Sequence, residues 1–403
     1  MIFWMMPDGA TRTQQMMDDF LKPFKKANPD IDIKITVINR HTLWGKIFTL
    51  KNSCPHEEMP DLIALPHYWT ELLIQTGVLE NLSALDKTIR VDDCAEFLKP
   101  HCFKKDSSDI YSVPWWFDIS ALHYREDHLK LITDNPQKLL STWAGLLDAC
   151  KALKENFEGS EGYFPIQNSD WRGTLSNRGL LPLLWSRGAN VIDAAGSNGV
   201  SEPAFGQAVA DYTELALKNY MPILRERSSI GNITSGRASM VIARRHGLTM
   251  YEGAHKDLPV NTLSIPRAGA NYVNYLGGVN LGVTKVGRAS SHALKLLKWM
   301  ALPANQIKYA RAAEGFPAQA AALESFISSS PERVKNYRQI IADSQTLPGQ
   351  MATGTFMEVL GELLSAVSTA AASGLYTKDF LGAQIKKAKE EVDDIIRLYG
   401  ERK

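Results

Sequence analysis

The feature that most constrains the fold is the alternation of strand and helix patterns through the first third of the chain. Ile31, Ile33 and Ile35 alternate with polar residues, and the apolar run 60–65 is bounded by turn residues, so both segments are predicted strands. In order, the predicted strands and helices are 2–5, 11–24, 31–37, 43–50, 60–65 and 68–75. Pro23 is expected to kink or shorten the first helix. This order predicts a mainly parallel sheet with helices on its faces, which binds ligands beyond the carboxyl ends of its strands.

The rest of the chain indicates a second lobe. A chain of 403 residues is longer than one that a single hydrophobic core usually supports, which favours two lobes or domains. The stretch 109–124 is long for one strand, and Pro114 inside it predicts a bend or an edge, where a crossover between lobes fits. Further strands are predicted at 239–243, 258–266 and 275–283, and helices at 143–155, 171–187, 203–219, 290–302, 304–313, 319–328, 331–343, 352–372 and 377–399.

Composition and motifs exclude several classes of function. A formal net charge of +1 gives no drive toward nucleic acid, and no uncharged apolar stretch is long enough for a membrane span. The segment 282–287 has the glycine spacing of a P-loop, but Arg288 stands where the phosphate-binding lysine belongs, and His56 lacks the second histidine of a zinc-protease motif. We therefore expect no cofactor and no metal. The cysteines at 54, 94, 102 and 150 leave two disulfides or free thiols equally open.

Tryptophans beside polar residues indicate a carbohydrate ligand. A sugar ring exposes flat C–H faces and a rim of hydroxyls, so its site combines aromatic platforms with polar side chains, as the segments 115–118 and 169–172 do. A single tryptophan is more often core filling, and Trp143, Trp185 and Trp299 on helical stripes are assigned to the core. The predicted aromatic and acidic ligand-binding residues are Trp4, Trp44, Trp69, Trp115, Trp116, Asp118, Asp170 and Trp171.

A basic group follows the predicted strand 239–243. Arg244 and Arg245, with His246 beside them, suit a fork around an anionic ligand. A solvated or ion-paired surface turn is the other interpretation, and the residues alone leave both open.

Short motifs occur in a characteristic order along nearly the whole chain. They lie at Trp4, Phe24, 28–33, 60–62, Trp69, 77–79, 111–127, 142–143, 236–240, 258–260, 277–280 and 314–318. Their order resembles that of the family 1 extracellular solute-binding proteins, the group that includes maltose-binding protein. An aromatic residue often stands in that family where this chain has His246. With two arginines alongside, this departure extends the candidate ligands to acidic or phosphorylated sugars.

The resemblance implies a type II periplasmic-binding-protein fold, an α/β architecture of two lobes joined by three crossovers. The implied N-terminal lobe is 1–114 and 275–313, the C-terminal lobe is 119–268 and 318–403, and the hinges are 115–118, 269–274 and 314–317. In such a fold Asp118 contacts the ligand at the hinge, and the segment with Gly277, Gly278 and Asn280 lines the cleft.

The expected function is that of an extracytoplasmic receptor of an ABC importer, not an enzyme, which traps a mono- or oligosaccharide by lobe closure. Its expected partners are the carbohydrate and the membrane permease, and the protein is expected to be monomeric, periplasmic or extracellular, and membrane-associated. On this hypothesis Trp115→Ala and Trp116→Ala lose ligand affinity and keep the fold. The alternatives are a carbohydrate-active hydrolase or lyase using distant carboxylates such as Asp118 and Asp170, and a scaffold without a small-molecule site.

Overall fold

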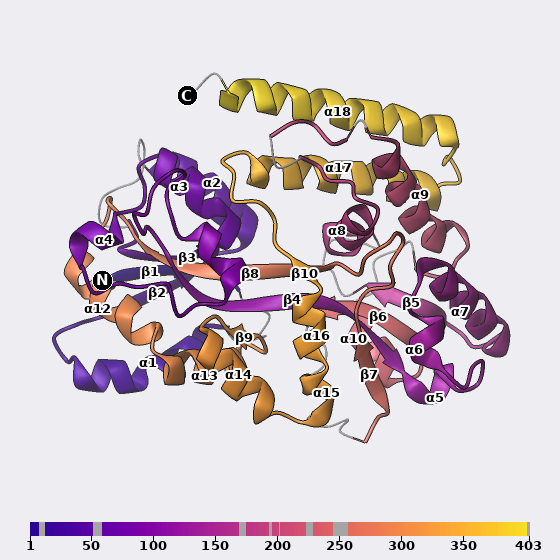
Figure 1. Ribbon diagram of the computed structural model, residues 1–403, viewed down its shortest axis with the longest axis horizontal. Coiled ribbons are helices and arrows are strands. Elements are labelled where there is room, and N and C mark those ends of the chain that lie inside the picture. The colour runs from indigo at the N-terminus through magenta and orange to yellow at the C-terminus, as the bar shows by residue number, and fades with distance from the viewer. Residues whose placement is uncertain are drawn as a thin grey trace. The chain divides into compact units, whose positions relative to one another are not determined.

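The computed structural model describes residues 1–7, 13–50, 59–168, 175–192, 196–200, 202–222, 229–244 and 257–400 (Figure 1). Its contacts divide the chain into two compact units, each assembled from segments that are far apart in sequence. Unit 1 comprises Met1–Asp118, Gly277–Ser330 and Thr346–Thr353. Unit 2 comprises Ile119–Leu276, Pro331–Gln345 and Gly354–Lys403.

The unit boundaries differ from the implied lobes mainly in the third crossover. Residues 314–317 were expected to be a hinge, yet they lie inside unit 1, which continues to Ser330. The reason is that the short strand β9 (Phe316–Pro317) pairs with β4 within unit 1, and Phe316 packs on Phe326 with ring centroids 5.8 Å apart. Residues 346–353 also belong to unit 1, although the sequence assigned them to the C-terminal lobe.

The sheet of unit 1 has the strand order β2-β1-β3-β8 (Figure 1). Strand β1 pairs in parallel with β2 and β3, and β8 runs antiparallel to β3 with Leu281 opposite Ala64. Parallel neighbours need crossover connections, which the helices between these strands provide, so the predicted alternation is confirmed. The strands are β1 (Ile2–Met5), β2 (Lys34–Val37), β3 (Leu62–Pro66), β4 (Val113–Arg125), β8 (Asn274–Val283) and β9, of which β4 and β8 continue into unit 2.

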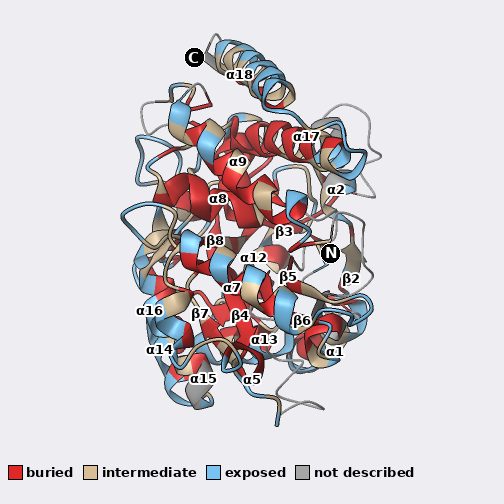
Figure 2. Cartoon of the chain, turned by 90° about the vertical axis from the view of Figure 1, so that its right-hand side faces the viewer, coloured by how far each residue is buried: buried red, intermediate tan, exposed pale blue. Residues whose placement is uncertain are grey.

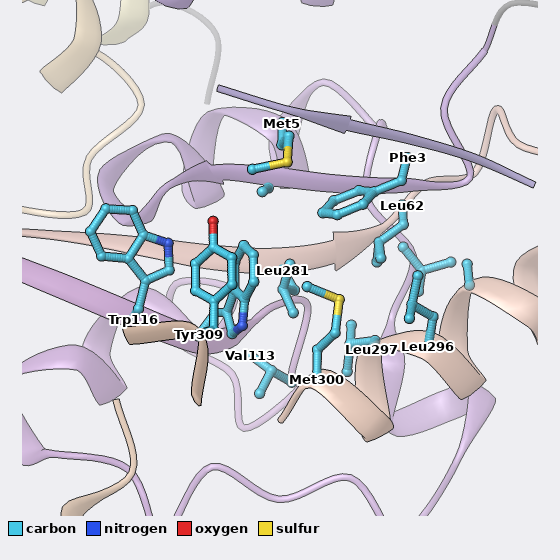
Figure 3. Packing of buried hydrophobic residues seen from close by; sticks show 14 of the residues in the cluster. Phe3, Met5, Leu62, Val113, Trp116, Leu281, Leu296, Leu297, Met300 and Tyr309 are labelled. Atoms are coloured by element: carbon cyan, nitrogen blue, oxygen red, sulfur yellow. The ribbon is translucent and has the colours of Figure 1, made fainter. Parts of the chain in front are cut away.

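The core of unit 1 packs helices against this sheet. Figure 3 shows Leu297 and Met300 of α12 in one buried cluster with Leu281 of β8. The helices of the unit are α1 (Thr13–Ala27), α2 (Arg40–Leu50), the 3-10 helix η2 (His67–Trp69), α3 (Thr70–Gln75), α4 (Leu82–Leu85), the 3-10 helix η3 (Glu96–His101), α12 (Ser290–Met300), α13 (Pro303–Ala312) and α14 (Ala320–Ser328).

Pro23 was expected to kink or shorten helix α1, and the helix is not shortened there. The proline ring removes the N–H that would bond to the carbonyl four residues earlier. Pro23 lies on the exposed face of α1, whereas Phe20, Leu21 and Phe24 are buried, so the apolar face holds the helix in place despite the lost bond. The helix ends at Ala27.

The sheet of unit 2 has the order β5-β6-β4-β7. Strand β6 runs parallel to β5 and antiparallel to β4, and β7 pairs antiparallel with the other edge of β4. Its remaining strands are β5 (Phe164–Asn168), β6 (Ala238–Arg244), β7 (Val260–Leu263) and β10 (Ser344–Gln345), the last of which pairs in parallel with β8. Strand β4 is one continuous, fully buried strand of 13 residues. The bend expected at Pro114 does not interrupt it, because this proline stands next to the first residue of the strand, and its carbonyl accepts from Gln306 Nε2 at 3.0 Å.

Helices form the rest of unit 2. Figure 2 shows α8 almost wholly buried and α18 largely intermediate or exposed. Ser176 caps α8 through the Gly179 N–H, so this helix begins at Asn177, later than the predicted 171. The predicted C-terminal helices are confirmed to within a few residues, except that the helix predicted at 331–343 is two short helices, Glu332–Lys335 and Tyr337–Ala342. The helices are α5 (Glu126–Leu129), α6 (Pro136–Leu139), α7 (Trp143–Asn156), α8 (Asn177–Ser186), α9 (Pro203–Leu217), α10 (Ser229–Thr234), α15 (Glu332–Lys335), α16 (Tyr337–Ala342), α17 (Thr353–Ala372) and α18 (Lys378–Gly400).

Candidate functional site

The carboxyl end of β3 leads directly into an aromatic segment. All five residues of β3 are buried, and His67, Tyr68 and Trp69 follow at once as η2. Trp44 of α2 packs on Trp69 with ring centroids 4.8 Å apart. The Arg40 guanidinium lies 5.6 Å from the Tyr68 ring centroid and 5.9 Å from that of Trp69, within cation–π range. We call Arg40, Trp44, Tyr68 and Trp69 the strand-end cluster.

A polar group lies next to the strand-end cluster. The rings of His67 and His101 have centroids 4.2 Å apart. His67 Nδ1 lies 2.7 Å from the Gly278 nitrogen, whose N–H donates to it in one tautomer, and 3.0 Å from the Gly278 carbonyl oxygen, to which it donates in the other. Asn280 Nδ2 donates to the His101 carbonyl at 3.1 Å and to Ser112 Oγ at 2.8 Å. We call His67, His101, Ser112, Gly278 and Asn280 the histidine network.

Four buried polar atoms without a hydrogen-bond partner lie in these two groups. They are His67 Nε2, His101 Nδ1, Trp69 Nε1 and Asn280 Oδ1, and other such atoms, Trp115 Nε1 among them, lie elsewhere in the part of the chain that the structure describes. Each such atom costs about 1–3 kcal/mol when left unpaired, so four in neighbouring residues call for an explanation. A small polar ligand that reached this region would find both donors and an acceptor available.

The histidines of the network are neutral at physiological pH. Burial lowers the pKa of His67 to about 4, and the backbone contact with Gly278 only partly opposes this. Burial, together with the neighbouring His67, lowers the pKa of His101 well below its usual value. The network therefore offers neutral hydrogen-bonding groups rather than positive charge, which suits hydroxyls better than an anion.

The structure places Trp115 and Trp116 in the hydrophobic core of unit 1. Trp115 has no exposed surface and stacks on Tyr309, with centroids 3.8 Å apart and an interplanar angle of 27°. Trp116 is 5 % exposed and lies beside Tyr309, as Figure 3 shows, and the backbone of Gly315 closes against its ring. Both tryptophans were predicted to contact the ligand; the structure buries both indoles, and their role in binding stays a prediction.

The other predicted residues of unit 1 occupy separate positions. Trp4 is buried in β1, and the Lys46 ammonium lies 5.3 Å from its ring centroid. Asp118 is buried in β4 as the last residue of the first segment of unit 1. Gly277 begins the unit 1 part of β8, directly before the Gly278 that contacts His67. Among the predicted residues, the structure therefore brings together Trp44 with Trp69, and Gly278 with Asn280.

The predicted residues of unit 2 are only partly described. Arg244 ends β6, where it stands opposite Ser120 of β4. Asp170, Trp171, Arg245 and His246 lie outside the described residues. The predicted roles of these five residues stay predictions.

Sequence reasoning missed half of the strand-end cluster and the histidines beside it. His67 and Tyr68 carry a usable signal, because they directly follow a buried strand whose end is the expected ligand edge. Arg40 follows the end of β2 in the same way. His101 carries no local signal, since it meets His67 only through the fold.

Some other features bear on the chemistry. The described residues include no group of three or more histidine, cysteine or acidic side chains placed to hold a metal ion. No described helix is long and apolar enough to cross a membrane. Cys94, Cys102 and Cys150 are free and buried, and Cys54 lies outside the described residues.

A family model described as bacterial extracellular solute-binding protein matches residues 19–339, well over half of the chain. A comparison with curated proteins finds no match.

Solved structures share the whole fold. A solute-binding protein of an ABC transporter from Thermotoga lettingae, bound with α-D-tagatose, is 18% identical with a TM-score of 0.79, covering 98% of this chain and 99% of that one. The MalE3 protein of T. maritima with maltose is 20% identical with a TM-score of 0.79 and covers 96% and 99%. The GacH receptor of Streptomyces glaucescens, solved unliganded and with acarbose, is 17% identical with a TM-score of 0.80 and covers 97% and 98%. At these identities the likeness establishes the fold.

Proposed function

Because the chain belongs to the bacterial extracellular solute-binding protein family, we propose that it is the receptor through which an ABC importer captures a carbohydrate. The observation that carries this proposal is the strand-end cluster with the histidine network beside it. Both groups lie at the edge of the unit 1 sheet where such sheets bind ligands. Proteins of the same fold bind tagatose, maltose and acarbose, which supports a sugar as the ligand class.

The chemistry of these groups matches a sugar. The partly buried indole of Trp44 suits the C–H face of a pyranose ring, and Arg40 offers donors to its hydroxyls. Trp69, which is 2 % exposed, packs against Trp44 with ring centroids 4.8 Å apart. The buried unpaired atoms of the histidine network offer further partners to a hydroxyl, which both donates and accepts. Because His67 and His101 are neutral, we propose a neutral mono- or oligosaccharide ahead of an acidic or phosphorylated one.

Lobe closure is part of the proposal. Strands β4 and β8 each continue from one unit into the other, which makes them candidates for the hinge. A ligand shifts such an equilibrium only by its differential affinity for the closed form, and a shift from 1:99 to 99:1 takes about 5.5 kcal/mol. Small-angle X-ray scattering with and without a saturating sugar tests it, because closure lowers the radius of gyration and a rigid receptor leaves it unchanged.

We further propose that the partner is the permease of an ABC importer and that the protein works outside the cytoplasm, tethered to the membrane. The family assignment supports an extracytoplasmic site of action. A pull-down of the solubilised permease by sugar-loaded receptor tests the partner, with the sugar-free receptor as control. Capture of the permease that does not depend on sugar would contradict a transport role.

The decisive experiment is a binding screen by thermal shift and calorimetry. Maltose, D-tagatose and acarbose form the neutral arm, and glucuronate and glucose 6-phosphate form the anionic arm. A ligand that binds only the native state raises its melting temperature, so we expect a shift in the neutral arm alone. Shifts confined to the anionic arm would overturn the neutral assignment, no shift in either arm would overturn the receptor proposal, and chromatographic loss of a bound sugar would favour the hydrolase or lyase.

A further inference from the structure

Unit 2 contains a cavity of about 410 Å³ that the proposed function does not use. Residues from four separate segments line it: Tyr124 of β4, Thr262 of β7, Ser141 after α6, and Gln339 of α16. Figure 1 labels these four elements. Its volume falls within the usual range of ligand sites, about 300–1,000 Å³. All of its described lining residues belong to unit 2, so it is distinct from the strand-end cluster of unit 1.

A buried asparagine fixes the walls of this cavity. Asn274 has no exposed surface, and its Oδ1 accepts from the Ile265 N–H at 2.8 Å while its Nδ2 donates to Ser264 Oγ at 3.1 Å. The same Nδ2 donates to the carbonyls of Ile340 at 3.3 Å and Asp343 at 3.2 Å. These bonds join the segment after β7 to the end of α16, so the cavity is bounded by hydrogen-bonded rather than loose segments.

A buried tyrosine lies at the wall of the cavity. Tyr124 has no exposed surface, and its hydroxyl interacts with the side chain of its cross-strand neighbour Asn261. The amide nitrogen of Asn261 donates to Glu126 Oε2 at 2.8 Å. Because Tyr124 and Asn261 both line the cavity, a ligand inside it meets a pair of hydrogen-bonding side chains.

The lining restricts the chemistry of such a ligand. It is rich in amide and hydroxyl side chains, which both donate and accept, and Tyr272 and Leu263 add apolar surface. None of the described lining residues is Lys, Arg or His, and Asp343 is the acidic one, so an anion would meet no opposite charge. We propose that this cavity is a second binding site of the protein, specific for a small neutral polyhydroxylated molecule such as a monosaccharide or a cyclic polyol.

Fluorine NMR of protein labelled with 3-fluorotyrosine monitors the tyrosines that line the cavity and so tests the proposal. Tyr124→Phe and Tyr272→Phe each remove one resonance from the spectrum and so assign it. D-Glucose, myo-inositol and xylitol are the probes. At least one of them is expected to shift both assigned resonances with a saturable dependence on concentration, and no saturable shift with any of the three would overturn the proposal.

Two matched variants on α16 separate the cavity from the rest of the protein. Gln339 is exposed and lines the cavity, so Gln339→Trp fills it, whereas Ala342 is exposed on the same helix and does not line it. We expect the saturable shift to disappear in Gln339→Trp and to persist in Ala342→Trp. Equal shifts in both variants would mean that the probes act from elsewhere and would refute the site.

Tyr124→Phe distinguishes a ligand contact from a structural role. Removing the hydroxyl loses its interaction with Asn261, so only a small fall in the melting temperature is expected. Probe affinity, followed at the Tyr272 resonance, is expected to weaken about fivefold through loss of one hydrogen bond. A lowered melting temperature with unchanged affinity would assign the hydroxyl to the fold instead.

Discussion

Unit 1 contains two clusters of tryptophan that look alike in sequence and differ in their surroundings. Trp115 and Trp116 lie among apolar partners and stack around Tyr309. Trp69 lies beside the Arg40 guanidinium, Trp44 is only partly buried, and the residues next to them carry buried polar atoms without partners. The first cluster has one such atom, Trp115 Nε1, among apolar neighbours, whereas Trp69 Nε1 belongs to a region with three more, on His67, His101 and Asn280. The second cluster is therefore the better candidate for ligand binding.

The largest expected effect comes from a substitution in the first cluster, that of Trp115 and Trp116. Trp115→Ala removes a fully buried indole and leaves a cavity, which costs about 3–5 kcal/mol of the free energy of unfolding. Urea titration followed by circular dichroism measures the loss. Trp115→Phe keeps an aromatic ring against Tyr309, so it is expected to lose less stability and to bind sugar like the wild type. Weakened sugar binding by a folded Trp115→Phe protein would show that Trp115 takes part in ligand binding.

The next effect distinguishes the two clusters by the pH dependence of the free energy of unfolding. Because His67 has a pKa of about 4 when folded and the unfolded chain about 6.5, the unfolded chain binds the proton first as the pH falls. The full contribution of His67 to the free energy of unfolding is therefore present above about pH 6.5. It decreases as the pH falls toward 4 and is smaller by about 2 kcal/mol at pH 5. His101 acts in the same direction, because burial lowers its pKa as well.

Chemical unfolding of wild type and His67→Gln at pH 7.5 and pH 5 measures this contribution. The glutamine variant is expected to lose less stability between the two pH values than the wild type, whereas Trp115→Phe is expected to keep the full wild-type dependence. An identical pH dependence of wild type and His67→Gln would show that His67 does not stay neutral in the folded protein.

The contrast between the clusters also shows what the sequence could predict. Alternating patterns sufficed for the βαβ order and for most of the C-terminal helices, because these depend on local periodicity. The environment of Trp115 did not follow from its neighbours, since the Tyr309 that covers it is nearly two hundred residues away in the chain. The contact of His67 with His101 could not be predicted from the sequence either, because it forms only in the fold. The bend predicted at Pro114 does not occur because the effect of a proline depends on its position within the strand.

A smaller effect is expected at the strand-end cluster, on binding rather than on stability. Trp44 is only partly buried, so Trp44→Ala is expected to keep the fold and to weaken binding of the best sugar of the screen about tenfold through loss of one aromatic face. Isothermal titration calorimetry measures the affinity. Trp299→Ala is the matched control, because that indole is also partly buried in unit 1 but packs on Phe20 with centroids 5.1 Å apart. Equal affinity in Trp44→Ala and Trp299→Ala would end the distinction between the clusters.

The smallest effect concerns how the histidine network holds its geometry. A Cβ added at Gly278 would lie 3.0 Å from Leu98 Cδ2 and 3.1 Å from His67 Nδ1, so Gly278→Ala must displace one of them. We expect a loss of about 1 kcal/mol in the free energy of unfolding together with weaker sugar binding. Gly45→Ala in α2 is the control, because nothing lies within 4 Å of its added Cβ and alanine favours a helix by roughly 1 kcal/mol over glycine. If Gly278→Ala lost stability and kept full affinity, the network would support the fold of unit 1 without contributing to the ligand site.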